Sequence, residues 1–244
     1  MWVTGAGTGF GEAMAVALGL CGARVVLTGR RADKLDAAVA AAERFGASAD
    51  RFTTLPLDVS AHDEVEAAAA RLGAAGITAL VHCAGAPQRL VPEGPLLASD
   101  GLEALWNTNV VATWRCLRAM VRAAAPRGVV RAVLFSSEAA WHFTSGFGPY
   151  NVSKAAVNSL GGSMAAEAAA QYPDCDVQIN VLNPGEARTE MNQGSDVSPY
   201  AIAPMVLTLI SQERGGPNGY FFHGDGRNLA FGSRAPWPAP LLSG

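Results

Sequence analysis

The sequence holds 244 residues, half of them hydrophobic and 16% charged, with a formal net charge of −3. A chain of this length can bury one large core, and without a cationic run it lacks the electrostatic footprint of a nucleic-acid or anionic-membrane partner. No apolar run reaches the roughly 18 residues of a membrane span and the start does not resemble a signal peptide, so we expect a cytoplasmic protein.

Short runs of β-branched and apolar residues recur along the chain, each bounded by glycine or polar residues, at 23–29, 52–59, 77–85, 129–137, 177–185 and 219–226. Ala-rich segments with helical spacing lie between them, at 33–45, 61–74, 101–125 and 151–171. This alternation predicts an α/β fold, a doubly wound parallel sheet with helices on both faces. We expect a single domain over 1–230 and an extended proline-rich tail over 231–244.

The opening stretch, MWVTGAGTGFG, combines a very short strand with a glycine-rich turn. About three residues precede the glycines, whereas buried strands usually run about five or six, so either the strand is clipped or the start is not the natural one. The spacing fits T-G-x-x-x-G-x-G, with Thr4, Gly5, Gly9 and Gly11, and a helical run follows at once. Such a turn can bind a diphosphate through backbone N–H groups and the positive end of the helix. A glycine-rich turn can also be only a turn.

The end of the second predicted strand, LTGRR, bears on the choice of cofactor. In dinucleotide-binding folds an acidic residue at this place bonds the ribose 2′-OH of NAD, and here Gly29 stands there instead. Arg30 and Arg31 follow, and a guanidinium can bind a phosphate bidentately while stacking on adenine. This favours NADP, with NAD as the alternative. Two exposed arginines at the start of the next helix would be the plainer interpretation.

The stretch YNVSKAAVNSL places Tyr150 and Lys154 four residues apart, on one face of a predicted helix. Arginine supplies sixteen of the eighteen cations of the chain, so an unpaired surface charge here would more naturally be arginine. A lysine offers a compact ammonium with three rotatable donors. A phenol is a usable acid but a poor base at neutral pH, and a nearby ammonium favours the phenolate. Tyr150 could then serve both directions of a carbonyl–alcohol interconversion.

With these motifs the chain resembles the short-chain dehydrogenase/reductase family, from Thr4 to about Gly226. The resemblance implies a Rossmann-type fold and hydride transfer between a nicotinamide cofactor and a small carbonyl or alcohol substrate. In the family's serine-tyrosine-lysine arrangement, Ser137 would hold the substrate oxygen, with Ser136 as the less favoured neighbour.

The resemblance also implies the remaining site residues. The family's helix asparagine falls on Asn109, which would connect Lys154 to a water relay, and Asn107 is the competing choice. Cofactor contacts are implied for Thr4, Gly5, Thr8, Gly9, Phe10, Gly11, Arg30, Arg31, Asp58, Val59, Ala84, Gly85, Tyr150, Lys154, Pro184, Gly185 and Thr189.

Three of these matches are incomplete or open to another interpretation. HCAG, at 82–85, keeps the Ala84 and Gly85 of the family's N-N-A-G but neither asparagine. Asp58 matches the family's adenine-contacting Asp-Val, although an Asp at the end of a strand often only caps a turn. Thr8 stands where many NADP-dependent relatives carry a basic residue. Thr189, by contrast, matches the position where the family holds the nicotinamide carboxamide.

The substrate side is less defined. Trp141, His142, Phe143 and Phe147 would line the pocket, or would pack in the core. We expect the segment 190–204 to form a short mobile flap, typical of a modest or open pocket. The apolar residues of 102–120 exceed what one core face needs, and many members of the family are dimers or tetramers, so we expect a homodimer or homotetramer.

Two other functions remain open from the sequence. A dinucleotide-binding sensor or scaffold would use the same fold, although Ser137, Tyr150 and Lys154 argue against a loss of chemistry. A small serine hydrolase is the weaker alternative, because the serine does not lie in a G-x-S-x-G turn. The histidines show no metal-ligand spacing and the four cysteines no CxxC pair, so we expect no metal site.

Overall fold

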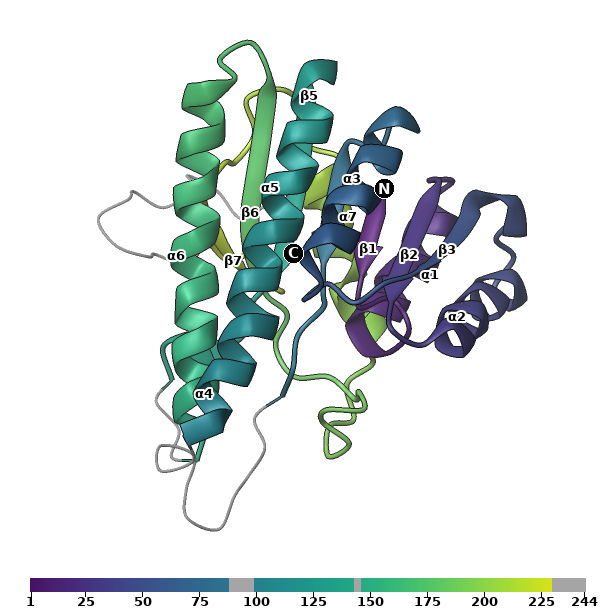
Figure 1. The fold of residues 1–244 in the computed structure, drawn as a ribbon. Helices are drawn as coiled ribbons and strands as arrows, with labels where there is room; N and C mark the ends of the chain where they lie inside the picture. Colours follow the sequence, from purple (N-terminus) through teal and green to yellow (C-terminus); the bar gives the residue numbers. More distant parts are fainter. Residues whose placement is uncertain (88–98, 143–145, 230–244) are drawn as a thin grey trace.

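The computed structural model describes residues 1–87, 99–142 and 146–229. Its centre is one seven-stranded sheet in the order β3-β2-β1-β4-β5-β6-β7, with every neighbouring pair parallel (Figure 1). The strands are β1 Trp2–Thr4, β2 Val25–Gly29, β3 Phe52–Pro56, β4 Ala79–His82, β5 Val129–Phe135, β6 Asp176–Asn183 and β7 Phe221–His223. The predicted doubly wound parallel sheet is confirmed.

The order of the strands reverses direction next to β1. The chain moves outward from β1 through β2 to β3, then returns to the other side of β1 with β4 and continues to β7. Thr4 pairs with Thr28 of β2 and with His82 of β4, so these three strands end level with one another. In open α/β sheets, ligands bind at the carboxyl ends of the strands beside such a reversal.

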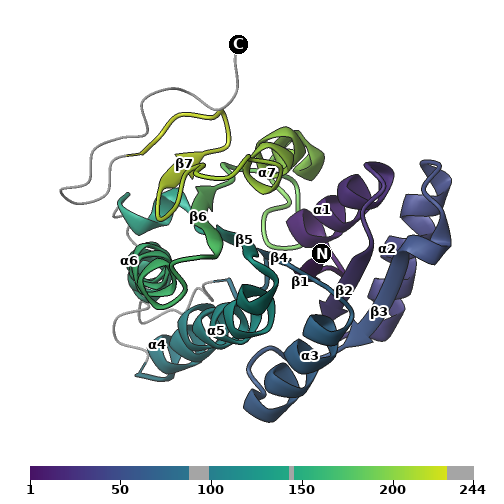
Figure 2. The same cartoon turned by 90° about the horizontal axis from the view of Figure 1, so that it is seen from above.

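Helices cover both faces of the sheet (Figure 2). One face carries α1 Gly9–Leu20, α2 Ala32–Arg44 and α7 Ala203–Ile210, and the other carries α3 His62–Ala74, α5 Ala112–Ala124 and α6 Gly148–Gln171. Successive residues of a strand point to opposite faces, so Trp2 packs in the core with α3, α5 and α6 while Val3 packs in the core with α1, α2 and α7. Burial on both faces explains the apolar run of a central strand such as β4, whereas the edge strand β3 is only partly buried.

Shorter elements complete the fold. The helix α4 Ser99–Leu105 continues through a π-helical turn, η2 Trp106–Val111, into α5. Single 3₁₀ turns are η1 Ala49–Arg51, η3 Ala125–Arg127, η4 Glu138–Ala140 and η5 Pro199–Ile202. Within the described residues, no helix is long and apolar enough to cross a membrane.

The structure corrects several predicted boundaries. The runs 52–59, 77–85, 129–137, 177–185 and 219–226 all end earlier as strands, because their last residues leave the sheet. After β7 the chain turns back, and the N–H of His223 donates to the carbonyl oxygen of Arg227. The helix predicted over 101–125 begins at Ser99 and is interrupted by the π-helical turn. The helix predicted over 151–171 begins at Gly148, since Pro149 is well tolerated in a first turn. The tail 231–244 lies outside the described residues.

The segment 190–204, predicted as a flap, is only partly irregular. Its end forms η5, and α7 begins at Ala203, with Pro204 in the first turn. No helix was predicted after this segment, and the prolines at 199 and 204 stand where the first turn of a helix tolerates them.

Candidate functional site

The glycine-rich turn joins β1 to α1 at the centre of the sheet. Gly5 and Gly9 have positive φ values of +66° and +58°, a conformation that side chains disfavour. A Cβ on Gly5 would lie 2.8 Å from the backbone nitrogen of Ala84, and a Cβ on Gly11 would lie 2.1 Å from the carbonyl oxygen of Gly5. These contacts explain why glycine is needed at three positions of the motif.

The first turn of α1 is open to an anion. Thr8 is the N-cap residue, and its side chain makes no capping hydrogen bond. The backbone N–H groups at this end therefore keep their capacity for a ligand, and the helix dipole favours negative charge there. The ring of Phe10 packs on the ring of Phe135 at a centroid distance of 5.6 Å, so Phe10 offers a ligand its backbone rather than its side chain.

Thr4 has a different place from the one expected of a cofactor ligand. Its side chain is fully buried, and its hydroxyl lies 2.9 Å from Nδ1 of His82. The backbone N–H of Ala84 also donates to this hydroxyl, at 3.4 Å. Thr4 thus joins the end of β1 to His82 and Ala84 at the end of β4, and its buried side chain presents no surface to a ligand.

The segment after β6 crosses over the glycine-rich turn. Gly185 has a φ of +71°, and its N–H donates to Asn183 Oδ1 at 3.1 Å, which turns the chain at Pro184–Gly185. Thr189 then lies against Gly9, since a Cβ on that glycine would be 3.1 Å from Thr189 Cγ2. The two predicted contact points, far apart in the sequence, are thereby brought together.

Tyr150 and Lys154 lie one turn apart near the start of α6. Lys154 is 7% exposed, and its Nζ donates to the carbonyl oxygen of Phe135 at 3.0 Å, where β5 ends. The same Nζ is 5.7 Å from the centroid of the Tyr150 ring. The ammonium is therefore a buried charge held at the end of the sheet and beside the phenol.

The two serines after β5 differ as the alternation of strand side chains predicts. Ser136 is buried, and its hydroxyl donates to the carbonyl oxygen of Lys154 at 3.4 Å. Ser137 is partly exposed, and its hydroxyl accepts from the N–H of Ala139 at 3.2 Å. The structure thus leaves Ser137, and not Ser136, accessible to a ligand.

Asn109 is buried in the same part of the site as Lys154, whereas Asn107 is exposed. Oδ1 of Asn109 accepts from the N–H of Ala86 at 2.7 Å. Its Nδ2 donates to the carbonyl oxygen of Ala86 at 3.2 Å and to Ser153 Oγ at 3.0 Å. A Cβ on Gly85 would be 3.3 Å from Asn109 Oδ1 and 3.7 Å from Lys154 Nζ, so this glycine keeps the end of β4 open between both polar groups.

The two arginines after β2 lie at the edge of the site, beside α2. Arg31 Nη2 makes an ion pair with Glu190 Oε2 at 2.9 Å, and both side chains are 53% exposed. Arg30 is exposed and close enough to Asp58 to lower the pKa of its carboxyl. The main cause of that lowered pKa is the hydrogen bond from the N–H of Ser60, because Asp58 caps the turn before α3. Val59, beside it, is buried.

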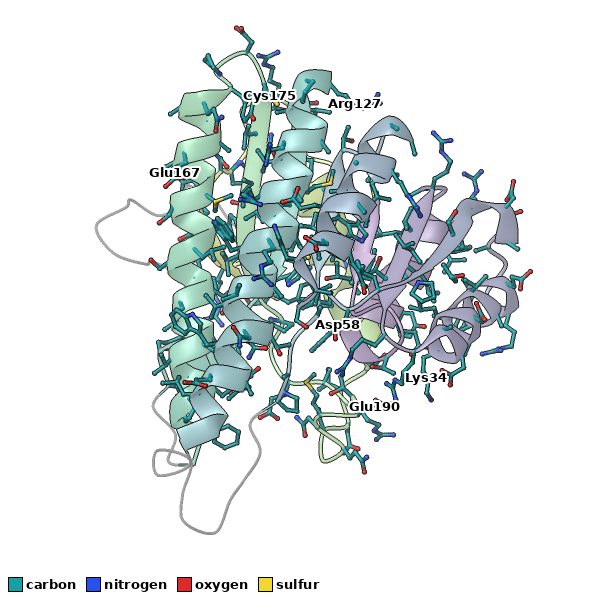
Figure 3. All side chains as sticks on the ribbon, viewed as in Figure 1. Lys34, Asp58, Arg127, Glu167, Cys175 and Glu190 are labelled. Atoms are coloured by element: carbon teal, nitrogen blue, oxygen red, sulfur yellow. The ribbon has the colours of Figure 1, made fainter. Side chains whose placement is uncertain are left out.

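A cavity of about 330 Å³ lies between the glycine-rich turn, α2 and the segment after Gly185. Four charged residues that sequence reasoning did not select line it: Glu12, Lys34, Arg188 and Glu190. Figure 3 shows Lys34 and Glu190 at the same end of the molecule, beyond the end of β1. Burial is the largest influence on the Glu12 carboxyl and raises its pKa. The only sequence signal for Lys34 is that lysine is rare in this chain.

The aromatic residues after Ser137 are partly accessible. Trp141 is 41% exposed and packs edge-on against Phe221 at a centroid distance of 5.2 Å, while Phe147 is 37% exposed. His142 is exposed, and Phe143 lies outside the described residues. Among the residues that the structure describes, no three His, Cys, Asp or Glu side chains gather as metal ligands would.

These features fit a dinucleotide. The uncapped start of α1 suits a diphosphate, and the glycines let its oxygens approach the backbone. Asn183, at the end of β6, keeps a buried Nδ2 for which no partner occurs among the described residues. The cations at positions 30, 31 and 34 surround the end of β2, where the adenosine half would lie.

Comparisons with known proteins agree with this geometry. The model of the short chain dehydrogenase family matches residues 1–198. The chain is 35% identical over 193 residues to the gluconate 5-dehydrogenase of Gluconobacter oxydans, covering 78% of this chain and 72% of that protein. It is 32% identical over 195 residues to the dehydrogenase/reductase SDR family member 4 of Oryctolagus cuniculus, covering 78% and 71%. A short-chain type dehydrogenase/reductase from Mycobacterium ulcerans superposes with a TM-score of 0.81 at 27% identity, over 91% of this chain and 86% of that one.

Proposed function

Because this chain belongs to the short-chain dehydrogenase/reductase family, whose oxidoreductases bind NAD(P) and act on small molecules, we propose that it interconverts a ketone or aldehyde and an alcohol with Tyr150 as acid and base. The observation that carries the proposal is the corner at the end of β5. There the buried ammonium of Lys154 lies beside Tyr150, and Asn109 lies across Gly85 from it.

The chemistry divides between the cofactor and the chain. A bound nicotinamide supplies the hydride acceptor or donor. Ser137 donates a hydrogen bond to the substrate oxygen, and the Tyr150 hydroxyl donates a proton to that oxygen as the carbonyl is reduced. In the oxidative direction Tyr150 accepts the alcohol proton. The ammonium of Lys154 stabilises the phenolate that reduction leaves behind.

We propose NADP as the preferred cofactor and NAD as the alternative. Gly29 offers no acceptor for a ribose 2′-OH, and Arg30 is exposed at the end of β2. A 2′-phosphate can accept bidentate hydrogen bonds from such a guanidinium. Lys34, on the first turn of α2, adds a third cation to this end of the molecule.

A titration and a screen test the function. Quenching or enhancement of NADPH and NADH fluorescence reports binding, and a screen of ketones, aldehydes and sugar acids, gluconate among them, reports turnover. Tyr150→Phe should abolish turnover and leave the dissociation constant of NADPH nearly unchanged, because only the proton donor is lost. Cofactor binding without turnover of any compound would instead indicate a sensor, and hydrolysis without cofactor binding a hydrolase. The comparisons support neither alternative.

Two substitutions test the cofactor preference. Arg30→Ala should weaken NADPH binding by about 1.5–3 kcal/mol, the value of a hydrogen bond to a charged group, and leave NADH binding nearly unchanged. Gly29→Asp should reverse the preference, because the carboxylate bonds a 2′-OH and repels a 2′-phosphate. A Cβ at position 29 would lie 3.3 Å from Leu35 Cδ2, so the neighbour needs to shift only slightly. Gly29→Asn has the same size without the charge and serves as the control.

We also propose that copies of the chain associate through α4, η2 and α5, as a homodimer or homotetramer. Leu102, Trp106 and Trp114 are 44%, 41% and 38% exposed on this continuous helix. Light scattering of the wild type and of Trp106→Ser should show a loss of association in the variant. A monomeric wild type at micromolar concentration would contradict the proposal. A cytoplasmic location stays a prediction from the sequence.

A further inference from the structure

His82 is a buried polar residue to which no role has yet been given. It is the last residue of β4, is 2% exposed, and stands where the family motif has an asparagine. Its register partners are Thr4 of β1 and Leu134 of β5, so it lies at the centre of the sheet, directly beneath the site.

The hydrogen bonds around His82 fix which ring nitrogen carries the hydrogen. Nε2 lies 2.9 Å from Thr113 Oγ1, and that hydroxyl lies 2.6 Å from the carbonyl oxygen of Asn109. A carbonyl oxygen can only accept, so the hydroxyl hydrogen of Thr113 lies on its bond to Asn109. Thr113 can then only accept from the ring, and Nε2 of His82 must be the donor.

The other side of the ring is consistent with this assignment. In a neutral imidazole with hydrogen on Nε2, Nδ1 is an acceptor, and Thr4 Oγ1 donates to it at 2.9 Å. Thr4 Oγ1 in turn accepts from the N–H of Ala84. The bonds run in one direction from Ala84 through Thr4, His82 and Thr113 to the carbonyl oxygen of Asn109.

The ring also stays neutral over the ordinary pH range. Complete burial lowers the pKa of His82 to about 3, and the nearby ammonium of Lys154 acts in the same direction. A second ring hydrogen, on Nδ1, would make the Thr4 hydroxyl an acceptor there, so the hydrogen of that hydroxyl would lose its bond to the ring. A charged ring therefore fits neither the burial nor the direction of the hydrogen bonds.

The end of this chain of bonds lies in the π-helical turn η2. The N–H of Ala112 bonds to the carbonyl oxygen of Asn107, five residues back, as in a π-helix. Asn109 lies inside this turn, with its carbonyl held by Thr113 and its side chain held by Ala86 and Ser153. Ser153 Oγ donates to the carbonyl oxygen of Tyr150 at 2.8 Å.

We propose that His82 is a positioning residue of the site: its neutral, Nε2-protonated ring holds the π-helical turn so that Asn109 stays across Gly85 from Lys154. The amide of an asparagine ends closer to the backbone than Nε2 does, so we expect an asparagine at position 82 to lose the bond to Thr113. The expected effect of His82 on turnover rests on the proposed function. The protonation state of its ring rests on the hydrogen-bond geometry alone.

A matched pair of substitutions at Thr113 tests the effect on turnover. Thr113→Ser keeps the hydroxyl and should keep kcat within about threefold. Thr113→Val keeps the shape but removes the hydroxyl, and should lower kcat by about tenfold or more, with the KM of the cofactor changed less than about threefold. The pH profile of kcat should shift in Thr113→Val and not in Thr113→Ser. Equal kcat values and equal profiles in the two variants would overturn the proposal.

His82→Asn extends the test, with His62→Asn as its control on the exposed start of α3. The first should lower kcat about as much as Thr113→Val does, while the second should not change it. Since His82→Asn could also unfold the protein, ¹⁵N NMR of the imidazole rings in the wild type gives an independent test. Nε2 of His82 should be protonated and Nδ1 unprotonated on both sides of about pH 6.5, where a free histidine titrates. The opposite tautomer, or titration in this range, would refute the assignment.

These outcomes separate the inference from the proposed function. A wild type that binds cofactor but turns over no carbonyl compound contradicts the proposed function only. Hydrogen exchange of the Asn109 side-chain amide then decides the inference: it should be faster in Thr113→Val than in Thr113→Ser. Equal exchange in the two variants would show that the chain of bonds does not hold Asn109.

Discussion

Lys154 is closely surrounded, as is Arg131, the other buried cation among the described residues. Its Nζ is within hydrogen-bond distance of the end of β5, near the Tyr150 ring, and close to where a side chain on Gly85 would be. Lys154 is only 7% exposed, so the space around its Nζ holds an ammonium and little else. The spacing of Tyr150 and Lys154 could be found from the sequence, because a helix fixes which residues share a face.

Lys154→Arg should therefore lower kcat by about a hundredfold or more, although the charge is kept. A planar guanidinium is larger and holds its donors in one plane, so it cannot reproduce the contacts that a compact ammonium makes with Phe135 and a ligand. Steady-state kinetics check this, and the thermal midpoint shows how far the fold tolerates the larger group. Near-normal kcat in the arginine variant would mean that charge alone is required.

Other residues of the site could not be found from the sequence. Lys34 reaches the cavity because α2 packs on the glycine-rich turn, where a Cβ on Gly7 would lie 2.9 Å from Lys34 Cβ. The pairing of Arg31 with Glu190 joins residues 159 positions apart. Such proximity is a property of the folded chain, and neither Lys34 nor Glu190 belongs to a local motif. His82 was noted only as a departure from N-N-A-G, because its partners lie on β1 and α5.

At the scale of elements, close packing of α6 against the sheet rests on a single glycine. A Cβ on Gly161 would lie 2.3 Å from Val181 Cγ2 of β6, whereas a Cβ on Gly162, the next residue, would have its nearest neighbour at 4.0 Å. The helix 151–171 was predicted from its periodicity, but periodicity does not show how near a helix lies to the strand beneath it.

We expect these two glycines to respond in opposite ways to alanine. Gly161→Ala should lower the free energy of unfolding by about 1–3 kcal/mol, because the added methyl forces α6 away from β6. Gly162→Ala should raise it by up to about 1 kcal/mol, through the better helix propensity of alanine. Urea denaturation of both variants provides the measurement. If Gly162→Ala lowered the free energy of unfolding by a similar amount, the distance between α6 and the sheet would not be the cause of the effect at Gly161.

The ion pair between Arg31 and Glu190 links the turn before α2 to the segment after β6. Glu190→Gln should release Arg31 for a cofactor phosphate and raise the ratio of NADPH to NADH affinity by about threefold, within the range of an exposed ion pair. Asp196→Asn breaks the pair with Arg188 in the same segment and is the control. Calorimetric titration of both variants checks the prediction. An equal gain for NADH, or a gain in the control, would contradict it.

At the scale of the whole molecule, the alternation of strands and helices was enough to predict the doubly wound sheet. The ends of the strands were harder to predict from the sequence. The residues that leave the sheet are as apolar or small as those within it, as at 83–86 after β4. The π-helical turn was also not predicted, since its hydrogen-bond shift leaves the apolar period of 101–125 nearly intact.

Burial of His82 should make the fold sensitive to acid. The pKa of His82 is about 3 in the folded chain, against about 6.5 for a free histidine side chain, so the unfolded chain binds more protons in this range. Stability from the neutral ring is then fully present above about pH 6.5 and decreases as the pH falls toward about 3, by a total of several kcal/mol. Urea denaturation at several pH values measures this slope, and His82→Asn should flatten it. An unchanged slope in that variant would assign the acid sensitivity to other groups.

The reversal of strand order beside β1 also affects how the chain assembles during its synthesis. β1 leaves the ribosome before β4, and Thr4 pairs with His82, 78 residues later. At about 5–20 residues per second, one side of β1 waits on the order of ten seconds for β4. During this time the apolar faces of Trp2 and Val3 have only part of their final cover, so nascent chains halted before β4 should bind a chaperone that recognises apolar segments. Chains halted after β5 should bind it less, and crosslinking at both lengths would show whether they do.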